Sequence, residues 1–472
     1  MSCLVYHSKN YLAAFLATTL LYSFTYSVVA QDKAKGVDIS TYKVKLALST
    51  LPKNIDKVNS VSKIKYNYSQ ASLKISPQGT HGLLLSYLNS EGLPVNNAQI
   101  ESDTAETSNQ KLAYIAPVTK VPTVDKKLWD KQVRAKYKNG LILTVSPGVK
   151  HIAIRKYTKA GPMFINVVEV NPALNPNIKI KPALAGVTLP HTKRIQNIVK
   201  ENDAIAGVNA SFFKPSSGVP LGTLVINEEL ITGPIYDRVT LGIKDNEFRM
   251  ARISLQGRVI TSNGQDIKID NVNQPRMLAA YNIIYSDKWG KLAPITPQYG
   301  LQVAIENGKI INISKDRLEI PANGYVMVGP EKQLGKLKIS DPVKIIFSSS
   351  PDWTDIKQAI SGGPYLVRDG QVYVDVQDQK FGSITGRNPR TAVGYTYDNR
   401  LIMVTIDGRQ KCSVGATLNE LARIMREFGC YNAMNLDGGS STQMIVRGKI
   451  VNHPLNSGGN YVSNGLIVKL EN

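Results

Sequence analysis

The stretch RLIMVTIDGRQKCSVGATLNELARIMREFGCYNAMNLDGGSSTQMIV, residues 400–446, contains the clearest pattern of secondary structure in the chain. An apolar run ends at Asp407, a helix is predicted over 418–428, and a second apolar run ends at Asp437. The helix has both a start and a stop signal in the sequence, which are Thr417, Glu420 and Gly429. We therefore interpret the stretch as a strand–helix–strand unit whose two strands run parallel.

The two aspartates of this unit are candidate site residues. Parallel strands end at the same edge of a sheet, where open α/β sheets bind their ligands. If the strands are neighbours, about 4.8 Å apart, the carboxylates of Asp407 and Asp437 face one cavity. Glycines let the backbone approach a ligand and offer N–H groups to an anion. The glycines and hydroxyls that follow the acids are Gly408, Gly438, Gly439, Ser440, Ser441 and Thr442.

An alternative is that both turns are structural, with Asp and Ser side chains bonded to their own backbone. For IDGRQ, residues 406–410, we favour this alternative. For NLDGGSST, residues 435–442, we favour a ligand site, because the turn has more polar groups than a hairpin needs.

The rest of the chain from about residue 141 consists of short β-branched runs broken by Gly, Pro and Asn, with a second helix predicted in LPHTKRIQNIVKEND. This mixture predicts an α+β (mixed α/β) domain over 141–472, with a mixed β-sheet core, flanking helices and a β-rich insertion at about 249–352.

Three further stretches combine a strand end with polar residues. AIAGVNASFF ends a strand at Asn209, and AISGGPYLVRDG contains a bend at Ser361, Gly362 and Gly363. GSITGRNPRTAVGYT carries Arg387 and Arg390 beside a strand, where a guanidinium is suited to clamp an anion. Each stretch also has a structural interpretation: a buried Asn, a tight turn and an ion pair, respectively.

Residues 1–30 carry the signature of a secretory signal. Lys9 precedes an apolar stretch over 11–29, and Ala30 completes a small-x-small end before Gln31. We expect cleavage after Ala30 and export to the periplasm, cell envelope or extracellular space. The alternative is an uncleaved membrane anchor.

The 472-residue chain is strongly basic, with a formal net charge of +21. Residues 31–140 hold 17 Lys and Arg against 9 Asp and Glu, and we interpret them as a partly disordered linker or accessory region with a short helix near DKKLWDKQVRAKY. The charge favours anionic surroundings such as an envelope surface, although a merely solvated basic surface is an equal alternative. Export and the absence of nucleic-acid motifs argue against nucleic acid.

Several catalytic classes lack their motifs. The four His of the mature chain are too scattered for the usual zinc spacings, and no P-loop or GxGxxG is present. GGSST lacks the last Gly of a nucleophile elbow and leads into a strand rather than a helix. Cys412 and Cys430 lie near opposite ends of the predicted sheet, so we expect no disulfide. We expect no cofactor and identify no metal ligands, and the sequence leaves a structural metal ion open.

Six blocks, taken in order, resemble the phosphodiester glycosidase family over about residues 145–470. They are AIAGVNASFF, AISGGPYLVRDG, RNPRTAVGYT, LIMVTIDGRQ, SVGATLNELARIMREFGCYNAMNLDGGSSTQMIV and VNHP. Three positions depart from the family pattern. Ala210 replaces a glycine after Asn209, Ser440 replaces a third glycine, and His453 stands where many members have Arg.

The resemblance implies hydrolysis of a sugar-1-phosphodiester to free sugar and a phosphomonoester. The leaving phosphate is weakly basic, so arginines take over much of a general acid's role. We expect Arg390 and Arg409 to clamp it, with Arg387 behind them. We expect Asp437 to attack the anomeric carbon or activate water, and Asp407 to orient Arg409 or sugar hydroxyls.

Two other functions remain open from the sequence. One is a non-catalytic envelope protein that binds glycans or assists exopolysaccharide assembly. The other is a phosphodiesterase that cuts the P–O bond. The three differ in their products: free sugar, none, and sugar-1-phosphate.

Overall fold

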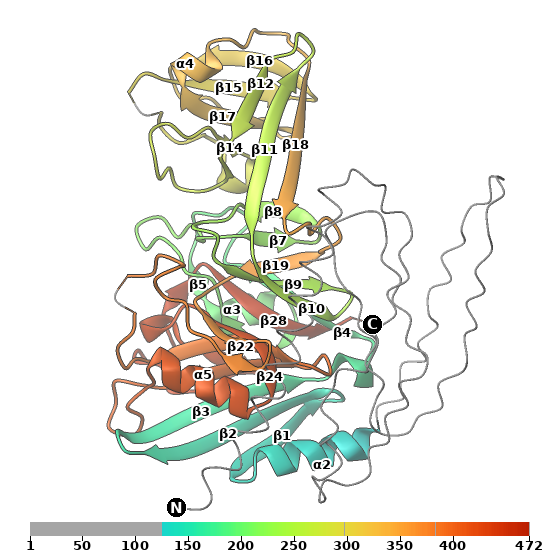
Figure 1. Ribbon diagram of the computed structural model, residues 1–472, viewed down its shortest axis with the longest axis vertical. Helices are drawn as coiled ribbons and strands as arrows, with labels where there is room; N and C mark the ends of the chain where they lie inside the picture. The colour runs from blue at the N-terminus through green and yellow to red at the C-terminus, as the bar shows by residue number, and fades with distance from the viewer. Residues whose placement is uncertain (1–124, 297, 383, 472) are drawn as a thin grey trace, which may run out of the picture. The chain divides into compact units, whose positions relative to one another are not determined.

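The computed structural model describes residues 125–296, 298–382 and 384–471 (Figure 1). All of these belong to one compact unit, Pro117–Asn472. The predicted signal peptide and most of the predicted linker lie outside the described residues. Within the described part, no helix is long and apolar enough to cross a membrane.

The largest sheet has eight strands in the order β1-β2-β3-β23-β22-β24-β20-β21. All of its pairings are antiparallel. Its strands in this order are β1 (Gly140–Ser146), β2 (Val149–Thr158), β3 (Gly161–Val170), β23 (Leu401–Ile406), β22 (Arg390–Thr396), β24 (Cys430–Asn435), β20 (Tyr365–Arg368) and β21 (Gln371–Val372). The strands that carry the predicted site form the middle of this sheet.

The predicted strand–helix–strand unit is wrong in one respect. Strands β23 and β24 run parallel, but β22 lies between them and is antiparallel to both. The two strands are therefore roughly 10 Å apart rather than neighbours. Because β22 begins where β23 and β24 end, the edge that carries the two aspartates also carries the start of β22.

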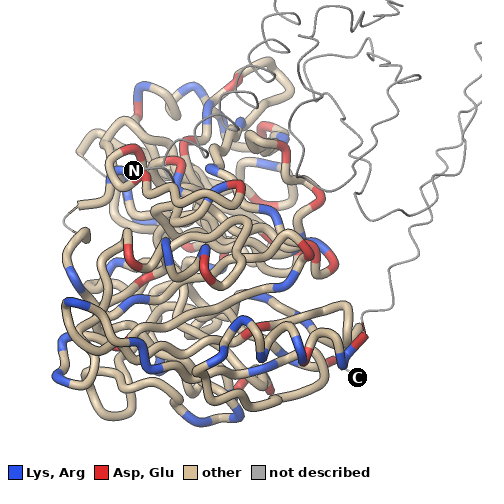
Figure 2. The backbone as a smooth tube through the Cα atoms, turned by 60° about the horizontal axis from the view of Figure 1, so that its bottom comes forward, with Lys and Arg blue, Asp and Glu red and all other residues tan. Residues whose placement is uncertain are grey.

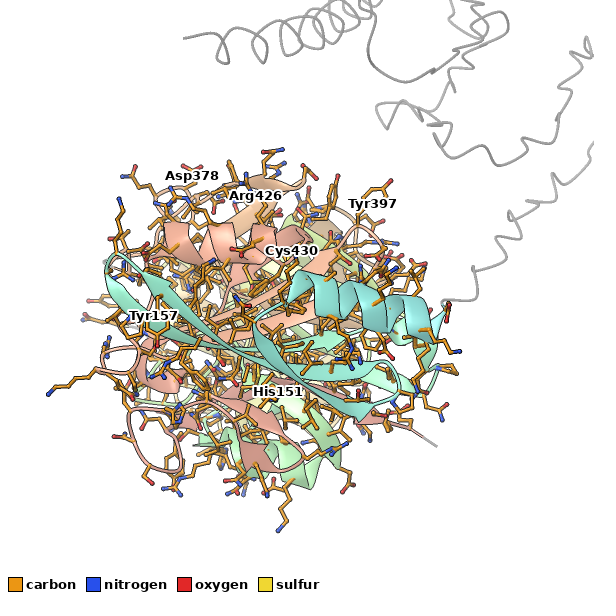
Figure 3. All side chains as sticks on the ribbon, turned by 90° about the horizontal axis from the view of Figure 1, so that it is seen from below. His151, Tyr157, Asp378, Tyr397, Arg426 and Cys430 are labelled. Carbon is orange, nitrogen blue, oxygen red and sulfur yellow. The ribbon has the colours of Figure 1, made fainter. Side chains whose placement is uncertain are left out.

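Two helices pack on one face of the eight-stranded sheet, as the view from below shows (Figure 3). Helix α5 (Leu418–Glu427) has the predicted capping box, in which Thr417 and Glu420 bond each other's backbone. Its apolar face includes Leu421 and Met425, which are fully buried. The core beneath the helices includes Cys430, labelled in Figure 3; it and the exposed Cys412 are free thiols.

Helix α2 (Lys126–Lys136) lies upstream of residue 141, yet it belongs to this core. The carboxylate of the fully buried Glu169 in β3 accepts hydrogen bonds from Trp129, Lys136 and Tyr137. A helix fixed by a buried carboxylate is part of the folded domain. We therefore include helix α2 in the folded domain, which extends it upstream of the predicted start at residue 141.

Two five-stranded sheets lie against the other face, and one core cluster contains residues of all three sheets. The first is β26 (Lys449–Ile450), β25 (Met444–Val446), β6 (Ala204–Asn209), β28 (Asn464–Leu470) and β4 (Ile178–Leu184); the second is β10 (Glu247–Arg252), β9 (Val239–Lys244), β19 (Gln358–Ser361), β7 (Leu224–Ile226) and β8 (Glu229–Thr232). The smaller elements here are α3 (Ile195–Glu201), η3 (Pro172–Leu174), η5 (Gly439–Ser441) and the pair β27 (Tyr461–Val462) and β5 (Lys193–Arg194).

The insertion between β10 and β19 folds into two further sheets with cores of their own, at the top of Figure 1. One is β12 (Asp266–Ile269), β11 (Ser254–Thr261) and β18 (Val343–Ser350); the other is β13 (Asn271–Val272), β14 (Ile283–Tyr285), β17 (Gly324–Pro330), β15 (Gly300–Glu306) and β16 (Lys309–Ser314), with η4 (Asp287–Trp289) and α4 (Glu331–Leu334) nearby.

The predicted α+β class is wrong, because the described residues form a mostly β structure. They contain 28 strands and only four α-helices, of which the longest has 11 residues. Every described strand pair is antiparallel except β13 with β14. The second predicted helix is only the seven residues of α3. Antiparallel strands need no crossover helices, so short β-branched runs account for most of the domain.

Basic and acidic residues are interleaved along the described backbone rather than separated into two regions (Figure 2). Many of the lysines and arginines form surface ion pairs, such as Lys156 with Glu427 and Arg258 with Asp266. Binding to an anionic envelope surface therefore stays a prediction from the net charge alone.

Candidate active site

The start of β22 lies between the two predicted acids. Arg390 is paired with Ile406, the residue before Asp407. Two residues further along β22, Ala392 is paired with Asn435 at the end of β24. The sheet thus brings Arg390, Asp407 and the turn that contains Asp437 to one edge, although they lie on three different strands.

The turn after β24 is fixed by the strand β6 of the facing sheet. The N–H of Asp437 donates to the carbonyl of Ala210 at 2.9 Å, and the Asn209 amide donates to the carbonyl of Asp437 at 2.7 Å. The Asn209 side-chain oxygen accepts from the Thr391 hydroxyl and from the N–H of Gln443. Asn209 is fully buried, so it positions the turn rather than contacting a substrate.

The carboxyl group of Asp437 is poised near neutrality. Removal from water raises its pKa to about 6, while hydrogen bonds from the Ser441 hydroxyl and the Gly438 amide oppose the rise. The residue as a whole keeps partial exposure. A carboxyl with this pKa, on a residue at the border of the solvent, has the properties of a catalytic base.

The two glycines after Asp437 allow close packing. A Cβ on Gly438 would lie 2.9 Å from the Pro389 carbonyl oxygen, and one on Gly439 would lie 3.6 Å from the Arg409 guanidinium. Gly439 also has φ of +60°, which favours glycine. The turn therefore lies directly against Arg409 and the segment that leads into Arg390.

Most amides of this turn already have partners within the protein. The N–H of Gly438 serves the Asp437 carboxyl, and that of Gly439 donates to Pro389. The N–H groups of Ser441 and Thr442 donate to carbonyls within the turn. Ser441 and Thr442 are buried and only Ser440 is exposed, so the arginines rather than the bonded amides are left to bind an anion.

Arg390 and Arg409 both lie against the Gly438–Gly439 turn, where added Cβ atoms would be 3.9 Å and 3.6 Å from their side chains. Arg390 is 4% exposed and donates to the carbonyls of Ile384, Gly386 and Ala416. Burial and then the charge of Arg409 lower its pKa to about 10. Arg409 is exposed and donates through Nε and Nη2 to the side-chain oxygen of Asn388. Among the described residues, neither guanidinium forms an ion pair.

Asp407 does not orient Arg409, which corrects our expectation. Its carboxylate, almost fully buried, accepts from the Asn452 amide at 2.9 Å and from the N–H of His453 at 2.9 Å. The Nδ1 of His453 lies 3.2 Å from the same carboxylate, and its ring packs on Phe164. The His453 side chain is 63% exposed. Asp407 thus holds an imidazole at the edge of the site.

Arg387 is part of the support for helix α5. It donates to Glu420 at 2.6 Å and to the Gly415 carbonyl at 2.7 Å. Because Glu420 also caps the helix, this ion pair joins the loop before β22 to the start of α5. The structure therefore favours the structural interpretation of Arg387 over a place behind the clamp.

Parts of the chain are similar to known proteins. A family model described as phosphodiester glycosidase matches residues 299–469. The chain is 33% identical over 97 residues to the SPbeta prophage-derived uncharacterized protein YomE of Bacillus subtilis, covering 21% of this chain and 15% of that protein. It is 32% identical over 165 residues to the N-acetylglucosamine-1-phosphodiester alpha-N-acetylglucosaminidase of Mus musculus, covering 32% of this chain and 29% of that protein.

Over residues 299–469 the chain resembles the phosphodiester glycosidase family. It spans less than a third of the length of the curated relatives it matches. A solved structure of a hypothetical protein from Synechocystis shares its fold, with a TM-score of 0.65 and 22% identity over 70% of this chain and 64% of that one.

One predicted part of the site lies in the interior. Ser361, Gly362 and Gly363 are buried. The Ser361 hydroxyl pairs with that of Thr240, and the Gly363 N–H donates to the carbonyl of Asn435. The bend therefore supports the end of β24 and does not face a substrate, which corrects its predicted role in binding.

Two parts of the site were missed in the sequence. The Asn452–His453 pair was visible only as the VNHP block, with no signal that its side chains hold Asp407. Arg238 had no motif at all, although it packs on Phe212 and Phe381 beside the site. Within the described residues, no group of three or more His, Cys, Asp or Glu side chains could hold a metal ion. The hollow lined by α3 and Arg447 contains none of the site residues.

Proposed function

We propose that this domain hydrolyses the glycosidic bond of a sugar-1-phosphodiester and releases free sugar and a phosphomonoester. The observation that carries the proposal is the position of Arg390 and Arg409, without a carboxylate partner, beside the Asp437 turn. Two neighbouring cations are mutually destabilising unless an anion lies between or against them. A phosphodiester supplies that anion.

Arg409 is the principal clamp in this proposal. Its guanidinium is exposed and rests on the neutral side chain of Asn388, which orients the fork without neutralising it. Arg390 is buried, and three backbone carbonyls fix its guanidinium. It therefore contributes its positive charge to the site rather than a free hydrogen-bonding fork. Charge stabilisation of the departing phosphate then takes the place of a general acid.

Asp437 supplies the carboxylate that acts at the anomeric carbon. A pKa of about 6 leaves it largely ionised at neutral pH while keeping it more basic than an ordinary aspartate. In its ionised form it attacks the carbon or takes a proton from the attacking water. The carboxylate of Asp407 holds His453 in place at the edge of the site, and it is not the reacting group.

Export completes the proposal. Lys9, the apolar stretch and Ala30 form a secretory signal in the sequence, which assigns the substrate to the periplasm, cell envelope or extracellular space. The curated mammalian relatives are named for a sugar-1-phosphodiester, which supports a glycan or sugar-phosphate substrate here.

Product analysis tests the proposal. The purified protein is incubated with sugar-1-phosphodiesters, and the products are separated by chromatography. We expect free sugar and the aglycone phosphate in equal amounts. Sugar-1-phosphate would instead show P–O cleavage by a phosphodiesterase, and binding without any product would show a non-catalytic glycan-binding protein.

A further inference from the structure

Arg238, immediately before β9, has unusual surroundings for a charged side chain. It is only 9% exposed. The carbon of its guanidinium lies 4.0 Å from the ring centre of Phe381 and 5.5 Å from that of Phe212. The two rings are 5.2 Å apart, and both side chains keep partial exposure. The guanidinium is therefore packed against aromatic surfaces at the border of the solvent.

No group among the described residues neutralises this charge. Within the described chain, the Arg238 side chain forms neither an ion pair nor a hydrogen bond, and its Nε is fully enclosed without a partner. Burial lowers its pKa to about 10, which leaves it charged at neutral pH. Cation–π contacts stabilise the cation, but an enclosed polar group without a hydrogen-bond partner still costs free energy. A ligand that accepts from the guanidinium removes this cost.

The Arg238 cluster, defined as Arg238, Phe212 and Phe381, adjoins the Asp437 turn on two sides. Phe212 lies two residues after Ala210, whose carbonyl accepts a hydrogen bond from the N–H of Asp437. Phe381 packs over Gly363, where an added Cβ would lie 2.8 Å from its ring.

The same bend joins the cluster to the strand that carries the acid. Gly363 is bonded to Asn435, the last residue of β24. Further along the chain from Phe381, the carbonyl of Ile384 accepts from Arg390. The cluster thus lies beside the same turn as the proposed phosphate clamp.

We propose that the Arg238 cluster binds a second anionic group of the substrate, separate from the scissile phosphodiester. This inference rests on the proposed function. The ligand class is a ring compound that carries a carboxylate or a phosphate. The ring packs on the phenyl faces, and the anion accepts two hydrogen bonds from the guanidinium. The anion belongs either to the sugar, as in a uronic acid, or to the aglycone, as in a nucleoside diphosphate.

The test compares three sugar-1-phosphodiesters that share one scissile bond. One is neutral elsewhere, one carries a uronic acid as the sugar, and one has a second phosphate in a nucleotide aglycone. We expect the wild type to prefer one anionic substrate. Arg238→Gln should lower kcat/KM for that substrate by about 10- to 100-fold and change the neutral one by less than about threefold. Arg238→Lys should fall between, because Lys keeps the charge but not the fork.

Arg423→Gln is the matched control, because it removes the same charge from an exposed position on α5 that is not part of the cluster. It should leave the preference unchanged. Equal losses on all three substrates, or a wild type that does not discriminate among them, would contradict the proposal. If Arg238→Gln does not fold by circular dichroism, Phe381→Leu replaces it, with the same selective loss expected.

Direct binding separates this proposal from the proposed function. Calorimetry measures the affinity of glucuronate and of inorganic pyrophosphate for the wild type and for Arg238→Gln. If the wild type hydrolyses no diester but binds one of these anions with a dependence on Arg238, the subsite stands and the hydrolase proposal fails. Absence of binding of both anions would overturn the subsite whether or not the diesters are cleaved.

Discussion

Asp407 and Asp437 follow buried strands in the same way, and each precedes a glycine at one edge of one sheet. Their surroundings differ. The Asp407 carboxylate accepts from Asn452 and from both the backbone and the ring of His453. The Asp437 carboxyl has two donors close in sequence, and burial raises its pKa to about 6. An Asp-Gly turn therefore acquires its chemistry from distant segments, because these decide how many hydrogen-bond donors the carboxylate receives.

The largest expected effect is on catalysis by Asp437→Asn. The carboxylate is required mainly in the transition state, so kcat should fall by roughly three or more powers of ten while KM changes little. Asp407→Asn should lower kcat far less. Both variants are assayed for release of free sugar from one diester, with circular dichroism as the folding control. Equal losses in the two variants would remove the distinction between the two acids.

The next effect distinguishes the two arginines. Arg409→Lys keeps the charge but loses the fork, so kcat/KM should fall by about 10- to 100-fold with unchanged stability. Arg390→Lys should lower both activity and the free energy of unfolding, because the buried guanidinium bonds three carbonyls. Urea unfolding and steady-state kinetics measure the two quantities. A stable Arg390→Lys protein would show that those bonds contribute little.

A smaller effect concerns the support around Asp407. Asp407→Asn replaces one acceptor oxygen by an amide and leaves a buried donor of Asn452 or His453 without a partner. The free energy of unfolding should fall by about 1–3 kcal/mol. Urea unfolding at pH 7 measures this loss. Unchanged stability would mean that the loop 452–453 does not depend on the carboxylate.

The smallest effect has the opposite sign. The raised pKa means that the folded protein holds the Asp437 proton more tightly than the unfolded chain, so ionisation costs stability. The cost is absent below pH ~4, grows as the pH rises to about 6, and is then constant. Asp437→Asn should therefore be more stable than the wild type above pH 6, by on the order of 2 kcal/mol, and equal to it below pH ~4. A destabilised variant at pH 7 would contradict the raised pKa.

Local patterns in the sequence were sufficient for some of these features. The capping residues Thr417 and Glu420 predicted the start of α5, and the apolar runs predicted β23 and β24. The family was also recognised correctly from the order of its blocks. Each of these signals lies within a short segment, where propensity and periodicity act directly.

Features that depend on pairing between distant segments were not predictable in this way. Nothing in residues 400–446 shows that β22 lies between β23 and β24. The fold class was wrong for the same reason. The packing of α2 did have a signal, because Trp129, Val133 and Tyr137 repeat every four residues and form one apolar face. Arg238 had none, because its aromatic neighbours are remote in sequence.

The pH dependence of free-sugar release tests the central claim most directly, since it requires both glycosidic cleavage and an unusual aspartate. We measure kcat/KM of the wild type from pH 4 to pH 8 on a neutral sugar-1-phosphodiester, whose own phosphate stays ionised throughout. The account predicts a decline toward low pH with an apparent pKa of about 6, the value of the Asp437 carboxyl. A rate that stays constant down to pH ~4.5, as an ordinary aspartate would give, would contradict the assignment of Asp437 as the reacting group.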